Sequence, residues 1–208
     1  YPHCDAAAEI AILTDPNGRR FTDEGLGGVC MANAIAQLAD PLSSHLIMDE
    51  AIWQTEPKIN HLTPINPSMP NAGGKLITAP DIASLAAKIG VAAEPLAGTV
   101  AAYNDAVGSG NFAALPVPRS VRKHKPMPIA KAPFHAVPLC AGVTGTMGGV
   151  VIDANAQAQT PAGAPFPGLY AVGTPVAGLE GGPRAGYVGG LSKAFVLGLL
   201  AAEHIAAR

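Results

Sequence analysis

The most restrictive feature of this sequence is a glycine-rich loop that leads directly into an apolar helix near the C-terminal end. Six glycines lie between Gly178 and Gly190, and residues 191–207 have the apolar spacing of a helix. Glycine concentrates where a backbone needs a positive φ or must approach a flat or charged group. A glycine loop that opens into a helix also directs N–H groups toward one place. The sequence therefore predicts a ligand site at the start of this helix.

Two short apolar runs precede the loop and are predicted to be strands. Residues 150–152 and 169–172 are separated by a polar connection rich in alanine, glycine and proline. The helix after the loop carries Leu191, Phe195 and Leu199 one turn apart, with small residues between them. This spacing favours a helix whose Leu191–Phe195–Leu199 side lies close on a sheet.

The overall composition limits the classes of partner. Apolar residues make up 49% of the 208 residues, charged residues only 13%, and the formal net charge is −2. Such a chain can bury one good core or two small ones, and it has no basic excess for nucleic acid or an anionic membrane. The longest apolar run, residues 194–202, is too short to span a membrane. We therefore expect a small-molecule substrate and neither nucleic acid nor membrane as a partner.

The cysteines and histidines form no metal or disulfide pattern. Cys4, Cys30 and Cys140 lie far apart and are odd in number, and the six histidines are scattered. No metal site is predicted. Cysteines without disulfide spacing fit a reducing compartment, which predicts a cytoplasmic location.

The first two thirds of the sequence read as short strands and helices joined by turns. Asp49 is a predicted helix N-cap, and Thr78-Ala79-Pro80-Asp81 is a predicted capping box for a helix that ends at Gly90. Residues 58–74 hold three prolines and are predicted to be a loop. Further expected elements are strands at residues 10–13, 45–48 and 134–139 and helices at 29–39 and 95–107.

A basic, irregular segment follows these helices. Residues 111–132 contain Arg119, Arg122, Lys123, His124, Lys125 and Lys131. A solvated surface loop is one interpretation, and a rim that attracts anions toward a site is the other.

Several motifs, taken together and in order, resemble the fumarate reductase/succinate dehydrogenase flavoprotein family. They are AILTDPNGRRFTDE (residues 11–24), LIMDEAIW (46–53), the helical pair near 82–107, TMGGVVID (146–153) and PGLYAVG (167–173). The resemblance implies an α+β fold. Residues 1–136 would form a capping domain of helices around a small sheet, and residues 137–208 would supply the C-terminal strands and helix of an FAD-binding domain.

The dinucleotide fingerprint G-x-G-x-x-G occurs nowhere in the 208 residues. In the family this motif belongs to the half-domain that holds the ADP part of FAD. The resemblance therefore implies FAD as the cofactor of the full-length parent, whereas the 208 residues alone are expected to bind it weakly and to be inactive. The surface that would meet the other half is expected to be apolar and prone to self-association.

The resemblance also implies roles for individual residues. Arg184 would grip a substrate carboxylate, for which a planar guanidinium is well suited. Glu24 would relay protons, although a loop-capping role is equally consistent with its position. Tyr187 is a candidate replacement acid. The implied cofactor contacts are Met147, Gly148, Gly173, Thr174, Gly189, Gly190, Leu191 and Ser192.

Four positions depart from the family pattern. Thr174 stands where relatives carry a glutamate that holds FAD hydroxyls, and Gly145 replaces a substrate-binding histidine. Trp53 and Gly28 stand at two arginines of the proton relay, and Trp53 is either a pocket wall or a core residue. These losses argue against the usual fumarate reduction.

Two functions follow from these observations. The first is part of an FAD-dependent oxidoreductase that moves a hydride between flavin and a C–C bond beside an activating group, in a substrate that carries a carboxylate. The second is a non-catalytic, truncated domain that serves as a binding or interaction module.

Overall fold

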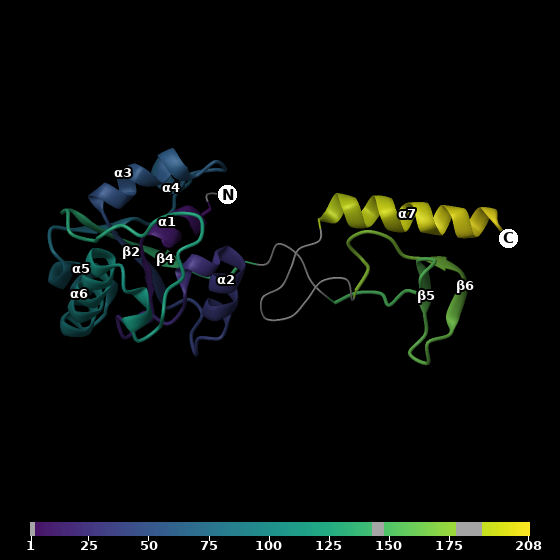
Figure 1. Cartoon of the computed structure of the whole chain (residues 1–208), viewed down its shortest axis with the longest axis horizontal. Helices are drawn as coiled ribbons and strands as arrows, with labels where there is room; N and C mark the ends of the chain where they lie inside the picture. Colours follow the sequence, from purple (N-terminus) through teal and green to yellow (C-terminus); the bar gives the residue numbers. More distant parts are fainter. Residues whose placement is uncertain (1–2, 143–147, 178–188) are drawn as a thin grey trace. The chain divides into compact units, whose positions relative to one another are not determined.

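The computed structural model describes residues 3–142, 148–177 and 189–208 of the chain. The chain divides into two compact units, residues 1–141 and 142–208, and each has its own cluster of buried apolar side chains. Figure 1 labels their helices and strands. Both units are built from helices and small antiparallel sheets, so the fold is of the mixed α+β class.

A four-stranded antiparallel sheet with the order β1-β2-β4-β3 forms the centre of the first unit. The strands are β1 (Ile12–Thr14), β2 (Ser44–Asp49), β3 (Ile77–Ala79) and β4 (Phe134–Leu139). All of β1 and nearly all of β2 are buried. Because successive side chains of a strand point to opposite faces, both faces of this part of the sheet are covered.

Helices and short 3₁₀ turns surround this sheet. Helix α1 packs on α3, α3 packs on α4, and α5 packs on α6 and on β3. The elements are α1 (Asp5–Ile10), η1 (Glu24–Leu26), α2 (Gly28–Ala36), α3 (Glu50–Ile59), α4 (Ile65–Asn71), α5 (Ile82–Ile89), α6 (Ala93–Ser109) and η2 (Phe112–Ala114).

The helix boundaries follow local chemistry at most sites. Asp49 caps α3 as predicted, since its carboxylate accepts a hydrogen bond from Ile52 N at 2.9 Å. The predicted capping box is one turn too early: Thr78 lies in β3, and Asp81 itself is the N-cap of α5, with Ser84 N at 2.6 Å. Gly90 ends α5 with a left-handed conformation (φ 75°), as predicted.

Two predictions in the first unit are wrong. Ile10 is the last residue of α1, and the strand begins only at Ile12. Residues 58–74 are not a continuous loop, because α4 lies within them. The buried Glu56 carboxylate on α3 accepts hydrogen bonds from Ile65 N at 3.2 and 3.1 Å, so α4 is capped from a neighbouring helix rather than by its own sequence.

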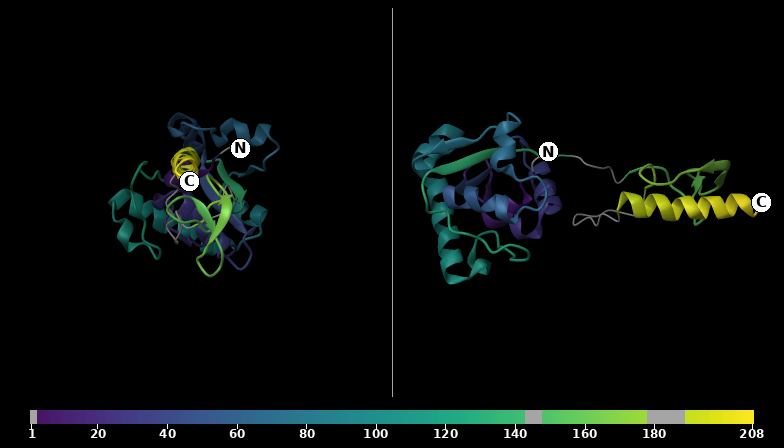
Figure 2. Two further views of the ribbon diagram at one scale, coloured as in Figure 1. Left: turned by 90° about the vertical axis from the view of Figure 1, so that its right-hand side faces the viewer. Right: turned by 90° about the horizontal axis from the view of Figure 1, so that it is seen from above.

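The second unit consists of a small hairpin and one long helix. Strands β5 (Gln157–Gln159) and β6 (Pro165–Tyr170) pair in antiparallel fashion, and α7 (Gly190–Ala206) lies beside them (Figure 2). The predicted strand at 150–152 makes only isolated bridges, Val150 to Val176 and Ile152 to Ala158. None of the helices in the described ranges is long and apolar enough to cross a membrane.

The side of α7 that faces the hairpin differs from the prediction. Its buried residues are Lys193, Leu197 and Ala201. Leu191, Phe195 and Leu199, which were predicted to lie on a sheet, are 76%, 75% and 60% exposed.

Candidate functional site

Glu24 lies at the centre of a buried ionic cluster in the first unit. Its Oε1 accepts hydrogen bonds from Leu13 N at 2.9 Å and Arg20 Nε at 3.0 Å. Its Oε2 accepts from Arg20 Nη2 at 2.6 Å and from Arg119 Nη1 at 2.9 Å. Both oxygens are therefore satisfied, and two guanidinium groups share one buried negative charge. We call Arg20, Glu24 and Arg119 the Glu24 cluster.

Arg119 is an exception within the basic segment, because its side chain is completely buried, whereas Arg122, Lys123, Lys125 and Lys131 are exposed as in a solvated surface loop. Its Nη1 also donates to the carbonyl of Ala11 at 2.6 Å, and its Nη2 donates to the carbonyls of Ala8 at 3.2 Å and Glu9 at 2.6 Å. The guanidinium lies 5.4 Å from the centroid of the Tyr103 ring, within cation–π range. This arginine is a core residue that ties its irregular segment to the end of α1.

Tyr103 extends the same arrangement from α6. Its hydroxyl donates to the carbonyl of Ile10 at 3.0 Å, and Met127 N donates to the same oxygen at 3.0 Å. Burial is the main cause that raises the pKa of Tyr103 well above its ordinary value. The phenol therefore stays neutral and serves as a fixed donor beneath α1.

The segment around Glu24 is held to the basic segment at a second point. Asp23 Oδ1 accepts hydrogen bonds from Gly25 N at 3.0 Å and Ser120 N at 2.8 Å. A Cβ on Gly25 would collide with the carbonyl of Ser120, so only glycine fits there. These contacts support the loop-anchoring role of Glu24, and its proton-relay role stays a prediction.

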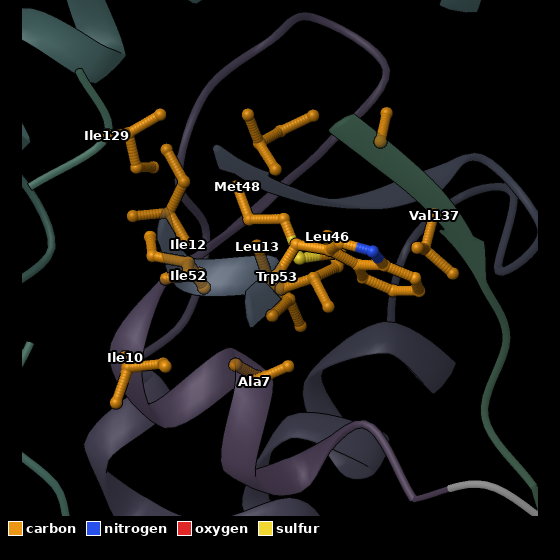
Figure 3. Close-up of a cluster of buried hydrophobic side chains, with 14 of the residues drawn as sticks. Ala7, Ile10, Ile12, Leu13, Leu46, Met48, Ile52, Trp53, Ile129 and Val137 are labelled. Atoms are coloured by element: carbon orange, nitrogen blue, oxygen red, sulfur yellow. The ribbon is translucent and has the colours of Figure 1, made fainter. Parts of the chain in front are cut away.

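Trp53 is a core residue rather than a pocket wall. Figure 3 shows its ring among Leu13, Leu46, Met48 and Val137, and only 7% of the residue is exposed. Gly28 is the second position at which an arginine of the relay is replaced, and a Cβ on Gly28 would contact the carboxylate of Asp5. Neither position therefore carries a polar side chain in place of the missing arginines.

The His135 ring lies against Trp53, with ring centroids 5.9 Å apart and an angle of 42° between the ring planes, and it links three elements by hydrogen bonds. Its Nε2 lies 2.8 Å from Glu50 Oε2, and its Nδ1 lies 3.0 Å from Thr78 Oγ1. Thr78 and His135 are direct cross-strand neighbours. The hydrogen bonds of His135 therefore join β4 to β3 through Thr78 and to α3 through Glu50.

In the second unit the structure brings several predicted cofactor residues into one region. Gly173 adopts φ +70°, and a Cβ on it would lie 3.3 Å from Ala194, so the turn before Thr174 packs closely on the first turns of α7. A Cβ on Gly149 would collide with the carbonyl of Pro175, so the segment after Gly148 runs tightly beside the same turn.

The start of α7 is accessible. Gly189 is the N-cap, with φ 98° and no side-chain hydrogen bond to the helix. Gly189 and Gly190 are half-buried, and Leu191 and Ser192 are exposed. A helix start of this kind can receive a flat or negatively charged group. Arg184, Tyr187, Met147 and Gly145 lie outside the described residues.

Within the described ranges, no group of three or more His, Cys, Asp or Glu side chains could hold a metal ion. The residues that sequence reasoning missed are Arg20 and Arg119. Arg20 stands four residues before Glu24, but the two residues are not on one helix, so their spacing does not predict the ion pair. Arg119 follows the apolar residues 115–118, whereas the other basic residues cluster at 122–125, and this apolar context is the one sequence signal that sets Arg119 apart.

The chain matches a known protein family and several known enzymes. Residues 3–187 match the family described as FAD binding domain. The NADH:acrylate oxidoreductase of Vibrio harveyi is 32% identical over 178 residues, which cover 86% of this chain and 17% of that protein. The fumarate reductase (cytochrome) of Shewanella frigidimarina is 29% identical over 196 residues, which cover 94% of this chain and 32% of that protein.

A solved structure agrees with these sequence matches. The 3-ketosteroid delta1-dehydrogenase of Sterolibacterium denitrificans, in complex with 1,4-androstadiene-3,17-dione, superposes with a TM-score of 0.74 and 26% identity over 95% of this chain and 38% of that one. The chain thus spans well under half the length of the relatives it matches. It belongs to the FAD-binding domain family that includes the fumarate reductase, succinate dehydrogenase and 3-ketosteroid dehydrogenase flavoproteins, and the cofactor of that family is FAD.

Proposed function

We propose that this chain supplies the substrate side and the flavin-ring side of the site in an FAD-dependent oxidoreductase. The enzyme would move a hydride to or from a carbon–carbon bond beside an activating carbonyl or carboxyl group. The match of residues 3–187 to the FAD-binding family carries this proposal. The relatives support it, because acrylate and fumarate each have a C=C bond beside a carboxylate. In this proposal residues 1–136 form the capping domain and residues 137–208 belong to the FAD-binding domain.

The residues at the start of α7 fit one edge of a flavin. The half-buried Gly189 and Gly190 present backbone without side chains, and the macrodipole of a 17-residue helix places roughly half a positive charge at this end. That charge stabilises negative charge at the adjoining ring edge. The hydroxyl of exposed Thr174 can donate one hydrogen bond to the cofactor, where relatives use a carboxylate. FAD, when bound, supplies the hydride acceptor or donor.

Arg184 is proposed to bind the carboxylate of the substrate. A guanidinium forms two parallel charge-assisted hydrogen bonds with a carboxylate, and this fixes the orientation of the bond that reacts. Tyr187 is proposed to hold or take the proton that accompanies the hydride.

We propose that the substrate is not fumarate, or that its proton is delivered by residues other than the arginine relay of the fumarate reductases. Trp53 is packed in the core, and Gly28 has no side chain. The positions that correspond to two relay arginines therefore supply no proton. We therefore propose an acrylate-like monocarboxylate rather than a dicarboxylate as the substrate, because Arg184 is the one residue assigned to bind a carboxylate.

The test uses the full-length protein that carries this chain. We expect it to purify yellow and to reduce acrylate-like acceptors with a dye as electron donor. The Arg184→Ala variant should keep its flavin absorbance while KM for carboxylate substrates rises about 100-fold, because two charge-assisted hydrogen bonds are lost. The matched control is Arg122→Ala, since Arg122 is exposed in the first unit. An unchanged KM in Arg184→Ala would show that the carboxylate binds elsewhere.

Glu24 needs a separate experiment, because its buried pairing makes any substitution destabilising. We expect Glu24→Gln to unfold more readily than the parent. If Glu24 relays protons, the folded fraction of the variant should also show lower kcat with an unchanged KM. If the kcat of the variant, calculated per bound flavin of the folded protein, equals that of the parent, Glu24 has only an anchoring role.

The non-catalytic module is the second candidate, and the exposed apolar side of α7 favours it. A colourless full-length protein without bound flavin would support this candidate and contradict the first.

A further inference from the structure

We propose that Thr78, His135 and Glu50 form a nucleophilic centre that accepts the acyl group of small activated esters on the Thr78 hydroxyl. The inference goes beyond the proposed function and does not depend on flavin. The three side chains come from β3, from β4 and from the start of α3. A hydroxyl beside a histidine that is itself held by a carboxylate is the arrangement that activates a nucleophile.

Two hydrogen bonds place the three groups in series. His135 Nδ1 lies 3.0 Å from Thr78 Oγ1, and His135 Nε2 lies 2.8 Å from Glu50 Oε2. Both distances fall within the reach that a nucleophile, its base and the group orienting the base require. The order is therefore hydroxyl, imidazole and carboxylate.

The Glu50 carboxylate determines which ring nitrogen of His135 can act as a base. Hydrogen bonds from Gln54 and then from His135 lower the pKa of Glu50, so the carboxylate is ionised and can only accept. In the neutral ring Nε2 must then carry the proton, and Nδ1 presents its lone pair to Thr78. The Thr78 hydroxyl consequently donates to Nδ1, which is the direction that nucleophilic attack requires.

The sheet holds the base in place and leaves the nucleophile open. Thr78 and His135 are direct cross-strand neighbours, and β3 is an edge strand of the sheet. His135 is only 4% exposed, and its ring lies against Trp53. Thr78, in contrast, is exposed. An ester can therefore reach the Thr78 hydroxyl from solvent, while the imidazole behind it is fixed by packing.

Lys88 adds a positive charge at the same position. Its Nζ, carried by α5, donates to the carbonyl oxygen of Thr78 at 2.6 Å, and an ammonium has further N–H groups beyond this one. Negative charge develops on the ester carbonyl oxygen during attack, and a nearby ammonium stabilises it. Because Lys88 is exposed, solvent screens this charge, and Lys88→Gln should slow the reaction only several-fold.

The proposed step balances in atoms and charge. Thr78 Oγ1 attacks the acyl carbon, and its proton passes to His135 Nδ1. The bond from the acyl carbon to the leaving oxygen then breaks, and the leaving group takes the proton from Nδ1. Water attacks the acyl-threonine by the same route and releases the acid. Glu50 keeps the ring in position and stabilises its charged form.

The test follows acetyl transfer from p-nitrophenyl acetate to the full-length protein. In the acid-quenched parent, we expect acetyl on Thr78 within the tryptic peptide 76–88, where Ser84 is the only other hydroxyl residue. Thr63 is the matched control, because it is exposed in the same unit and makes no hydrogen bond to a histidine side chain in the described part of the chain. Thr78 should be acetylated about 100-fold faster than Thr63.

Variants assign the reaction to the hydroxyl and its base. Thr78→Val removes the hydroxyl and keeps the β-branched shape at an exposed strand position, so the variant should fold. The release of p-nitrophenolate that depends on Thr78 is the difference between the parent and Thr78→Val. This difference should persist in Thr78→Ser and disappear in His135→Gln.

Glu50 acts through His135 and is tested by its effect on the ring. Glu50→Gln should slow the acetylation of Thr78 at least about 10-fold, because the wrong tautomer of His135 becomes accessible. Nitrogen NMR of the His135 ring should show the proton on Nε2 in the parent and the loss of that preference in the variant. An unchanged tautomer together with an unchanged rate would contradict the positioning role.

Two results would overturn the proposal as a whole. Equal acetylation of Thr78 and Thr63 would mean that the three side chains only tie β3 to β4 and α3. Acetylation of Lys75 or Lys88 in place of Thr78 would mean that the ester reacts with surface amines alone. A colourless protein with rapidly acetylated Thr78 would lose the proposed function and keep this centre, and a yellow protein without that acetylation would do the reverse.

Discussion

The Nη1 atom of Arg119 lies 2.9 Å from Oε2 of Glu24, although 95 residues separate them in the sequence. Both side chains are completely buried. The pair joins the segment after α6 to the connection between β1 and α2, and Arg20 supplies a second positive charge. The excess positive charge is stabilised by backbone carbonyls at the end of α1, which the Arg119 guanidinium also contacts. The Glu24 cluster therefore connects three segments of the first unit: the end of α1, the connection between β1 and α2, and the segment after α6.

Arg119→Ala should destabilise the first unit by about 3 kcal/mol or more. The substitution removes a buried partner of Glu24 and leaves three backbone carbonyls without their guanidinium donor. Urea unfolding followed by the fluorescence of Trp53 measures this effect. Trp53 is the only tryptophan and lies in the core of the first unit, so the signal reports that unit.

Arg122→Ala is the matched control for this prediction. Arg122 lies in the same segment but is exposed, so its removal should change the free energy of unfolding by less than about 0.5 kcal/mol. Equal, small effects of the two substitutions would contradict a buried Arg119.

Asp49→Ala should cost more than Asp81→Ala, although both residues are helix N-caps. Asp81 accepts one amide of its own helix, so its loss should cost about 1 kcal/mol. Asp49 caps α3 and also accepts the amides of Ala130 at 2.9 Å and Lys131 at 2.7 Å while buried. Because these are charge-assisted bonds to buried groups, we expect about 3 kcal/mol for Asp49→Ala. The same unfolding assay ranks the two variants, and equal costs would rule out a role for Asp49 in anchoring the segment before β4.

The elements that the sequence predicted well depend on interactions between near neighbours. The Asp49 cap, the Gly90 end of α5 and strand β4 each follow from residues only a few positions apart. The α+β class and the FAD family followed from motifs in order. By contrast, α4 was missed because its cap is Glu56 on another helix.

The burial of Arg119 could not be read from composition. A segment with six basic residues normally lies in solvent, and the partners of Arg119 are about a hundred positions away. The exposed side of α7 was mispredicted for a different reason. The periodicity of Leu191, Phe195 and Leu199 correctly identifies an apolar side, but two sides of this helix are apolar and the periodicity does not decide which one faces the hairpin.

Cys4 should react with thiol reagents far more slowly than Cys140. Burial, followed by the nearby charges of Asp5 and Glu56, raises the pKa of the Cys4 thiol from 9.0 to about 11, whereas Cys140 is exposed. Since only the thiolate attacks, two pKa units correspond to about a 100-fold lower thiolate fraction at neutral pH. Timed alkylation with iodoacetamide and peptide mapping measures both rates. Comparable rates would mean that Cys4 is exposed and ionises normally.

The raised pKa of Cys4 should also make the first unit less stable at high pH. The unfolded chain releases the Cys4 proton near pH 9.0 and the folded chain near pH 11, so the unfolded state gains stability first. The contribution of Cys4 is present below pH 9 and is lost as the pH rises toward 11. Cys4→Ala should flatten the unfolding free energy over this window, and Cys140→Ala should leave it unchanged.

His45 should make the first unit less stable in acid. Burial, and then the positive charge of Lys75, lowers the pKa of His45 below its ordinary value of 6.5, and the buried Nδ1 has no hydrogen-bond partner among the described residues. The unfolded chain therefore takes up this proton first as the pH falls below 6.5, so stability is lost through the lowered pKa. His45→Gln should flatten the unfolding free energy in this acid range. In Lys75→Gln, the imidazole pKa measured by NMR should move back up while burial still holds it below 6.5, and an unshifted titration would contradict the part assigned to Lys75.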